Sequence, residues 1–106
     1  MLIKLFCNVG MSTSILVDKM KLAAEKKGKD DIIESYAISE LSTEVKNADA
    51  VLLGPQVGFK IADAKKICEP LGIPCDVIPS KDYGMVDGMA VLKFAHMLVK
   101  EQKKNV

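Results

Sequence analysis

Four short apolar runs divide the chain, and between them apolar side chains recur at helical spacing. The runs are bounded by glycine, proline or polar residues, which is typical of buried strands. The predicted strands cover residues 2–6, 31–38, 50–54 and 75–79.

The segments between these runs predict four helices. Apolar residues recur every three or four positions from Ser12 onward, and Gly28 is a suitable stop for this first helix. Ser39 is a suitable cap for a short second helix, and Pro55 is well placed to begin a third. A last helix is expected over about residues 86–102.

Strands that alternate with helices predict right-handed crossovers and a parallel sheet. The expected fold class is therefore α/β: a four-stranded parallel sheet with helices on both faces, in a single domain over residues 1–106. In open parallel sheets, ligands bind beyond the carboxyl ends of the strands. In this chain those ends are followed by residues 7–14, 54–58 and 80–84, where we expect the functional site.

The composition narrows the classes of function. Fifteen basic residues, all lysines, stand against fourteen acidic ones, and the net charge of +1 gives no indication of nucleic acid as a partner. Three cysteines without paired spacing indicate neither a disulfide framework nor a metal site, and no cofactor motif is present. No signal peptide or membrane-spanning run is found, so we expect a cytoplasmic protein that does not insert into a membrane.

The first strand runs into a loop with unusual chemistry. Cys7 ends the strand, and Gly10 with three hydroxyl residues leads into the helix. Backbone amides at a helix start, together with the helix dipole, favour an anion. A thiol there would favour its nucleophilic thiolate form, and a phosphocysteine intermediate is a natural consequence. The alternative is that Cys7 is a small buried apolar residue at a strand end.

Two other functions remain alternatives at this point. Low-molecular-weight tyrosine phosphatases carry Cys-x-x-x-x-x-Arg-Ser after the first strand of a similar fold. Counted from Cys7, the arginine position is Thr13 and the serine position is Ser14, so the guanidinium that would hold the phosphoryl oxygens is missing. A flavodoxin-like module that binds a nucleotide phosphate reversibly is a non-enzymatic alternative, although no glycine-rich nucleotide motif is present.

Three blocks of sequence, "CNVGMSTSILVDKM", "ADAVLLGPQV" and "DYGMVDGMAVL", resemble one known family over nearly the whole chain. It is the IIB component of the lactose/cellobiose (diacetylchitobiose) branch of the bacterial phosphoenolpyruvate-dependent sugar phosphotransferase system. The resemblance implies a four-stranded parallel sheet similar to the low-molecular-weight tyrosine phosphatase fold. It also implies that Cys7 is the phosphorylation site, held by a loop of Asn8, Val9, Gly10, Met11, Ser12, Thr13 and Ser14.

The resemblance further implies the partners of this chain. Cys7 would accept a phosphoryl group from a phosphohistidine on a IIA phosphocarrier protein. It would pass the group to a sugar, such as cellobiose, diacetylchitobiose or lactose, bound by the membrane permease IIC. The protein would then be cytoplasmic and associated with the membrane through IIC.

Other residues are candidates for smaller roles. Gln56, Asp82 and Tyr83 lie in loops expected at the edge of Cys7, where they either line the site or only begin helices and turns. Cys68 and Cys75 lie on apolar segments and are expected in the core. The last helix is expected to carry His96 on a solvated face shared with lysines, and Ala90, Phe94, Met97, Val91, Ala95 and Leu98 on its apolar side.

Overall fold

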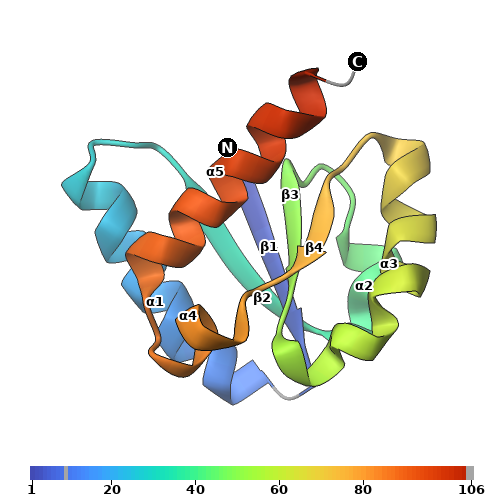
Figure 1. Ribbon diagram of the computed structural model, residues 1–106, viewed down its shortest axis with the longest axis horizontal. Coiled ribbons are helices and arrows are strands. Elements are labelled where there is room, and N and C mark those ends of the chain that lie inside the picture. Colours follow the sequence, from blue (N-terminus) through green and yellow to red (C-terminus); the bar gives the residue numbers. More distant parts are fainter. Residues whose placement is uncertain (9, 105–106) are drawn as a thin grey trace.

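A computed structural model describes residues 1–8 and 10–104 and shows one parallel sheet between two layers of helices (Figure 1). The sheet order is β2-β1-β3-β4, and all three strand pairs are parallel. The strands are β1 (Leu2–Cys7), β2 (Ile32–Ala37), β3 (Ala50–Leu53) and β4 (Cys75–Val77). The predicted fold class and all four strands are confirmed, within one or two residues at most ends.

Two long helices cover one face of the sheet, and shorter helices cover the other (Figure 1). The first face carries α1 (Gly10–Lys26) and α5 (Gly88–Lys104). The second carries α2 (Leu41–Glu44) and α3 (Ile61–Cys68), with short 3₁₀ turns η1 (Ile38–Glu40), η2 (Pro55–Lys60) and η3 (Glu69–Leu71) beside them. The sequence pattern did not predict α4 (Ser80–Gly84), which follows β4.

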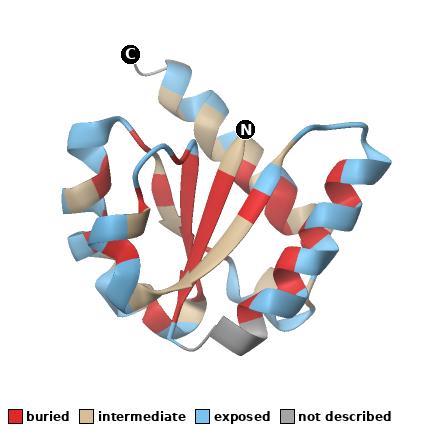
Figure 2. Ribbon diagram, turned by 180° about the vertical axis from the view of Figure 1, so that it is seen from behind, coloured by how far each residue is buried: buried red, intermediate tan, exposed pale blue. Residues whose placement is uncertain are grey.

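Each face of the sheet has its own apolar core (Figure 2). Side chains alternate along a strand, so Ile3 and Leu5 of β1 face α1 and α5, whereas Phe6 faces α2 and α3. The second core also holds Cys68 and Cys75, as predicted for these two cysteines. A hydrogen bond with Cys68, together with burial, raises the pKa of the Cys75 thiol, which is therefore neutral and structural.

Lys4 is a polar side chain inside the second core that the periodicity did not reveal. It is only 8% exposed. Its ammonium donates hydrogen bonds to the carbonyl oxygens of Glu44 (2.6 Å) and Lys46 (3.1 Å), at the C-terminal end of α2. The buried charge is thus satisfied, and it holds α2 against the middle of the sheet.

The boundaries of several helices differ from those that the sequence predicted. Gly28 is confirmed as the stop of α1, with a positive φ of 64° and the amide of Lys29 bonded to the carbonyl of Ala24. Ser39, by contrast, lies inside η1 and caps no helix. The last helix begins at Gly88 because Val86 adopts a left-handed φ of 51°, which ends the turn after α4.

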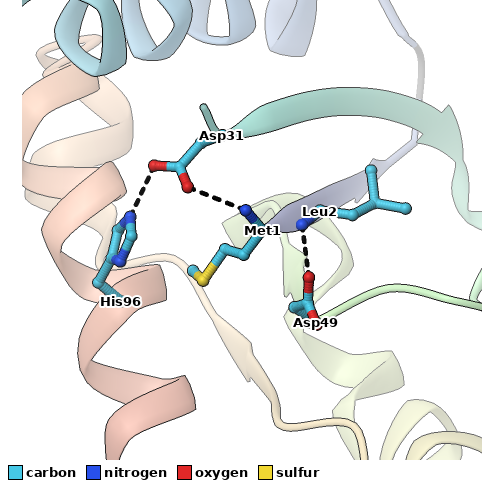
Figure 3. Close-up of polar contacts among 5 residues, drawn as sticks. All are labelled: Met1, Leu2, Asp31, Asp49 and His96. Carbon is cyan, nitrogen blue, oxygen red and sulfur yellow. Dashed lines mark hydrogen bonds and ion pairs between the residues drawn. The ribbon is translucent and has the colours of Figure 1, made fainter. Parts of the chain in front are cut away.

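The last helix also differs from its predicted faces. Met97, expected on the apolar side, is 45% exposed. His96, expected in solvent, is only partly exposed, and its Nε2 lies 2.7 Å from Asp31 Oδ2 (Figure 3). The other Asp31 oxygen accepts a hydrogen bond of 3.3 Å from the amino group of Met1. His96 therefore ties α5 to the start of β2.

Within the described residues, no helix is long and apolar enough to cross a membrane.

Candidate functional site

The three predicted loops lie at one edge of the sheet, at the carboxyl ends of their strands (Figure 1). β1 leads directly into α1, β3 into η2, and β4 into α4. Because the sheet is parallel, these three connections converge on the end of β1, where Cys7 lies.

Cys7 and Thr13 form the centre of this site. Alternation along β1 directs Cys7 to the same face as Leu5, toward α1. Its Sγ lies 3.3 Å from Thr13 Oγ1, in a contact in which either group can donate the hydrogen bond. Both side chains are buried, Cys7 with 1% and Thr13 with 0% of its surface exposed. The thiol therefore lies beside the N-terminal turn of α1, next to a hydroxyl group.

The start of α1 supplies the electrostatic environment of the thiol. The helix begins at Gly10, three positions after Cys7, and its first turn contains no acidic residue. The first amides of a helix lack carbonyl partners within the helix and carry the positive end of its dipole. This end of α1 is therefore suited to an anion on Cys7.

The missing side chain of Gly54 lets the loops after β3 and β4 approach Cys7. A Cβ atom built on Gly54 would lie 3.3 Å from Cys7 Cβ, 2.9 Å from Gln56 Oε1 and 3.6 Å from Tyr83 Cε1. The three side chains thus surround the position where Gly54 has no side chain. The amide of Gly54 also donates a 2.8 Å hydrogen bond to the carbonyl of Phe6, which fixes this glycine beside the end of β1.

Of the other three predicted site residues, two lie near Cys7 and one does not. Gln56 is exposed and Tyr83 is half-buried, and both lie beside Cys7. Asp82 contributes its carbonyl oxygen to a hydrogen bond from the Asp87 amide (3.0 Å), and no contact among the described residues brings its carboxylate to the thiol.

The loop after Cys7 is described only in part. Asn8 and Ser14 are exposed, and Gly10, Met11 and Ser12 form the start of α1. Val9 lies outside the described residues.

Sequence reasoning missed the steric role of Gly54. The available signal was a Gly-Pro pair directly after an apolar strand; the sequence places residues 54–58 at the expected site but does not reveal that Gly54 itself approaches Cys7. The close approach to Cys7 and Tyr83 depends on three segments that are far apart in the chain.

Within the described part of the chain, no group of three or more histidine, cysteine, aspartate or glutamate side chains could hold a metal ion. The thiol, the hydroxyl of Thr13 and the start of α1 are groups that can carry and surround a phosphoryl group.

Comparison with known proteins identifies the family of this chain. The family model described as "PTS system, Lactose/Cellobiose specific IIB subunit" matches residues 2–94. The chain is 42% identical to the galactose-specific EIIB component of Lactococcus lactis subsp. cremoris and to the cellobiose-specific EIIB component of Lactococcus lactis subsp. lactis. Each match covers 92% of this chain and 94% of the relative. The oligo-beta-mannoside-specific EIIB component of Bacillus subtilis is 37% identical over 94% of this chain and 97% of its own length.

Solved structures show the same fold. The cellobiose-specific IIB component of Borrelia burgdorferi superposes with a TM-score of 0.80 at 38% identity, over 96% of this chain and 94% of that one. The lactose-specific IIB domain of Streptococcus pneumoniae gives a TM-score of 0.84 at 19% identity, over 92% of this chain and 96% of that one, and supports the fold alone. This chain therefore belongs to the lactose/cellobiose-specific IIB family, the phosphotransferase components of sugar phosphotransferase systems.

Proposed function

We propose that Cys7 accepts a phosphoryl group from a phosphohistidine on a IIA protein and passes it to a sugar bound by a IIC permease. The observation that carries this proposal is the placement of Cys7 at the carboxyl edge of the sheet, beside the N-terminal turn of α1, with its Sγ 3.3 Å from the Thr13 hydroxyl. Cys68 and Cys75 lie in the opposite core and have no comparable surroundings.

Each transfer exchanges one bond to phosphorus for another. In the first, the Cys7 sulfur forms an S–P bond as the N–P bond of the phosphohistidine breaks, and the thiol proton passes to the imidazole. In the second, a sugar hydroxyl oxygen forms a P–O bond, the S–P bond breaks, and the hydroxyl proton returns to the sulfur. Cys7 is thereby regenerated, and no cofactor is consumed.

The loop that would hold the phosphoryl group runs from Asn8 to Ser14. Support comes from the start of α1 at Gly10, since successive amides at a helix start can bind phosphoryl oxygens. The loop contains no arginine, and Thr13, at the position of the phosphatase arginine, is fully buried. A neutral cradle suits a relay, because a guanidinium clamp would stabilise the group and the transition state of its hydrolysis.

The partners must reach Cys7 from the same edge of the sheet, so they would use a shared docking face. Large apolar side chains are exposed on segments that flank this edge: Ile15 (57%), Phe59 (78%) and Met85 (69%). Together with Gln56 and Tyr83 they would form a small, transient interface, in keeping with a complex that dissociates in every cycle. The protein would work in the cytoplasm, at the membrane surface, through contact with IIC.

The sugar is proposed from the relatives. The relatives are named as specific for galactose, cellobiose and oligo-beta-mannosides. We infer that the transported sugar is a beta-linked disaccharide such as cellobiose, diacetylchitobiose or lactose, recognised by IIC.

The test is phosphoryl transfer from phosphoenolpyruvate through the general phosphotransferase proteins and a candidate IIA protein. We expect mass spectrometry to find one phosphoryl adduct, which maps to Cys7 and is absent from Cys7→Ser. Cys75→Ser is the matched control and should be labelled like the parent. A label on His96, or one that survives Cys7→Ser, would contradict the proposal. Steady hydrolysis of p-nitrophenyl phosphate without any partner would instead indicate a phosphatase.

A further inference from the structure

Tyr83 lies close to the side chain of Cys7 although it is 76 positions further along the chain. Its Cε1 atom and the Cβ of Cys7 are both in van der Waals range of the one point where Gly54 lacks a side chain. The ring also packs against the core between the sheet, α1 and α5. The ring thus lies close to the side chain of Cys7 across Gly54, and Tyr83 as a whole is half-buried.

Backbone hydrogen bonds hold Tyr83 in the segment between β4 and α5. Its amide donates to the carbonyl of Pro79 (3.0 Å), and its carbonyl accepts from the amide of Val86 (3.1 Å). Val86 has the strained φ of 51°, which costs a β-branched residue about 1–3 kcal/mol and persists only where the surroundings enforce it. The turn from α4 to α5 therefore holds Tyr83 at the mouth of the site.

The next two residues anchor this turn. The Asp87 carboxylate accepts a 3.0 Å hydrogen bond from the amide of Ala90 and caps α5. Gly88 is buried so close to the backbone of Lys19 that an added Cβ would lie 2.4 Å from its carbonyl carbon. The turn is thus attached to both α1 and α5.

We propose that the ring of Tyr83 shields the phosphoryl group on Cys7 from water, a role that rests on the proposed phosphorylation of Cys7. Hydrolysis needs a water molecule to attack phosphorus opposite the sulfur. The water oxygen forms a P–O bond, the S–P bond breaks with Cys7 as the leaving thiolate, and the water proton passes to solvent. An aromatic ring this close to the side chain of Cys7 would exclude water molecules from part of the space around the phosphoryl group.

Such a shield would preserve the phosphoryl group on Cys7 after the protein has left IIA and before it meets IIC. A relay protein that has left IIA and not yet met IIC gains nothing from hydrolysis, which releases inorganic phosphate and wastes the transfer. Tyr83 would act only by excluding water, and it takes no part in the bonds that form and break.

The experiment measures the lifetime of the phosphorylated protein after the donor proteins are removed and without an acceptor. We expect Tyr83→Ala to shorten the half-life roughly tenfold, whereas Tyr83→Phe, which keeps the ring, should match the parent. Tyr36→Leu is the matched control, because the chain's other tyrosine packs on the opposite face of the sheet and should leave the lifetime unchanged. If Tyr83→Ala does not fold, Tyr83→Leu replaces it.

The outcomes separate this inference from the proposed function. A parent protein that is never phosphorylated on Cys7 overturns the proposed function. If the parent is phosphorylated and Tyr83→Ala or Tyr83→Leu decays at the same rate, only the shield is overturned. Equal decay of Tyr83→Phe and Tyr83→Ala would likewise overturn the role of the ring.

Discussion

At the scale of single residues, the contact between Cys7 Sγ and Thr13 Oγ1 places a hydroxyl group next to the proposed nucleophile. The Thr13 hydroxyl is placed to donate a hydrogen bond to a phosphoryl oxygen on Cys7, and a hydrogen bond to a charged group contributes about 1.5–3 kcal/mol. We expect Thr13→Val, which keeps the shape and removes the hydroxyl, to slow phosphorylation of Cys7 by roughly ten- to a hundredfold. The rate is measured by mass spectrometry in the transfer mixture.

Two variants control the Thr13 prediction. Thr13→Ser retains a hydroxyl and should recover much of the rate, and Thr43→Val changes an exposed threonine on α2 and should have no effect. A Thr13→Val rate equal to that of the parent would show that the hydroxyl does not assist the thiol. Thr13→Arg, which would approach the phosphatase loop, has no free space for its side chain, since Thr13 is completely buried.

At the scale of elements, the packing of α5 on α1 depends on the absence of a side chain at Gly88. An added Cβ would lie 2.4 Å from the carbonyl carbon and 2.6 Å from the carbonyl oxygen of Lys19, both backbone atoms that cannot rotate away. We expect Gly88→Ala to lower the free energy of unfolding by about 1–3 kcal/mol, because the helices must separate. Urea denaturation measures the change.

Gly84 provides the matched control for this packing. It lies in α4, and an added Cβ there would meet nothing within 4 Å. Gly84→Ala should therefore be neutral or stabilising by up to about 1 kcal/mol. Equal effects of the two substitutions would contradict the steric explanation.

At the scale of the whole molecule, Asp31 joins α5 to the first residues of the sheet (Figure 3). Burial by itself would raise the pKa of Asp31, but hydrogen bonds from His96 and from the Met1 amino group outweigh it, so the pKa lies below its usual value. A carboxyl group whose pKa is lowered by folding stabilises the fold above its unfolded pKa of about 3.9. This contribution is lost as the pH falls through the lower pKa of the folded state.

The pH dependence of stability tests this contact. We expect Asp31→Asn to be less stable than the parent near neutral pH, with a difference that shrinks as the pH falls below about 4. Urea denaturation between about pH 3 and pH 7 measures it. Asp18→Asn, on an exposed position of α1, should show no such trend. A difference independent of pH would mean that the Asp31 charge does not stabilise the fold.

The sequence by itself determined the alternation of strands and helices, the parallel sheet, and the position of Cys7 at its carboxyl edge. These features follow from the spacing of apolar residues and from the handedness of crossovers, which are local or general. Only the tertiary structure decided that Gly54 leaves room between Cys7 and Tyr83. It also decided that the Lys4 ammonium donates to the carbonyl oxygens at the C-terminal end of α2, and that His96 contacts Asp31. Each of these contacts joins segments that are distant in the chain, and their meeting depends on strand register and helix packing, which no local pattern encodes.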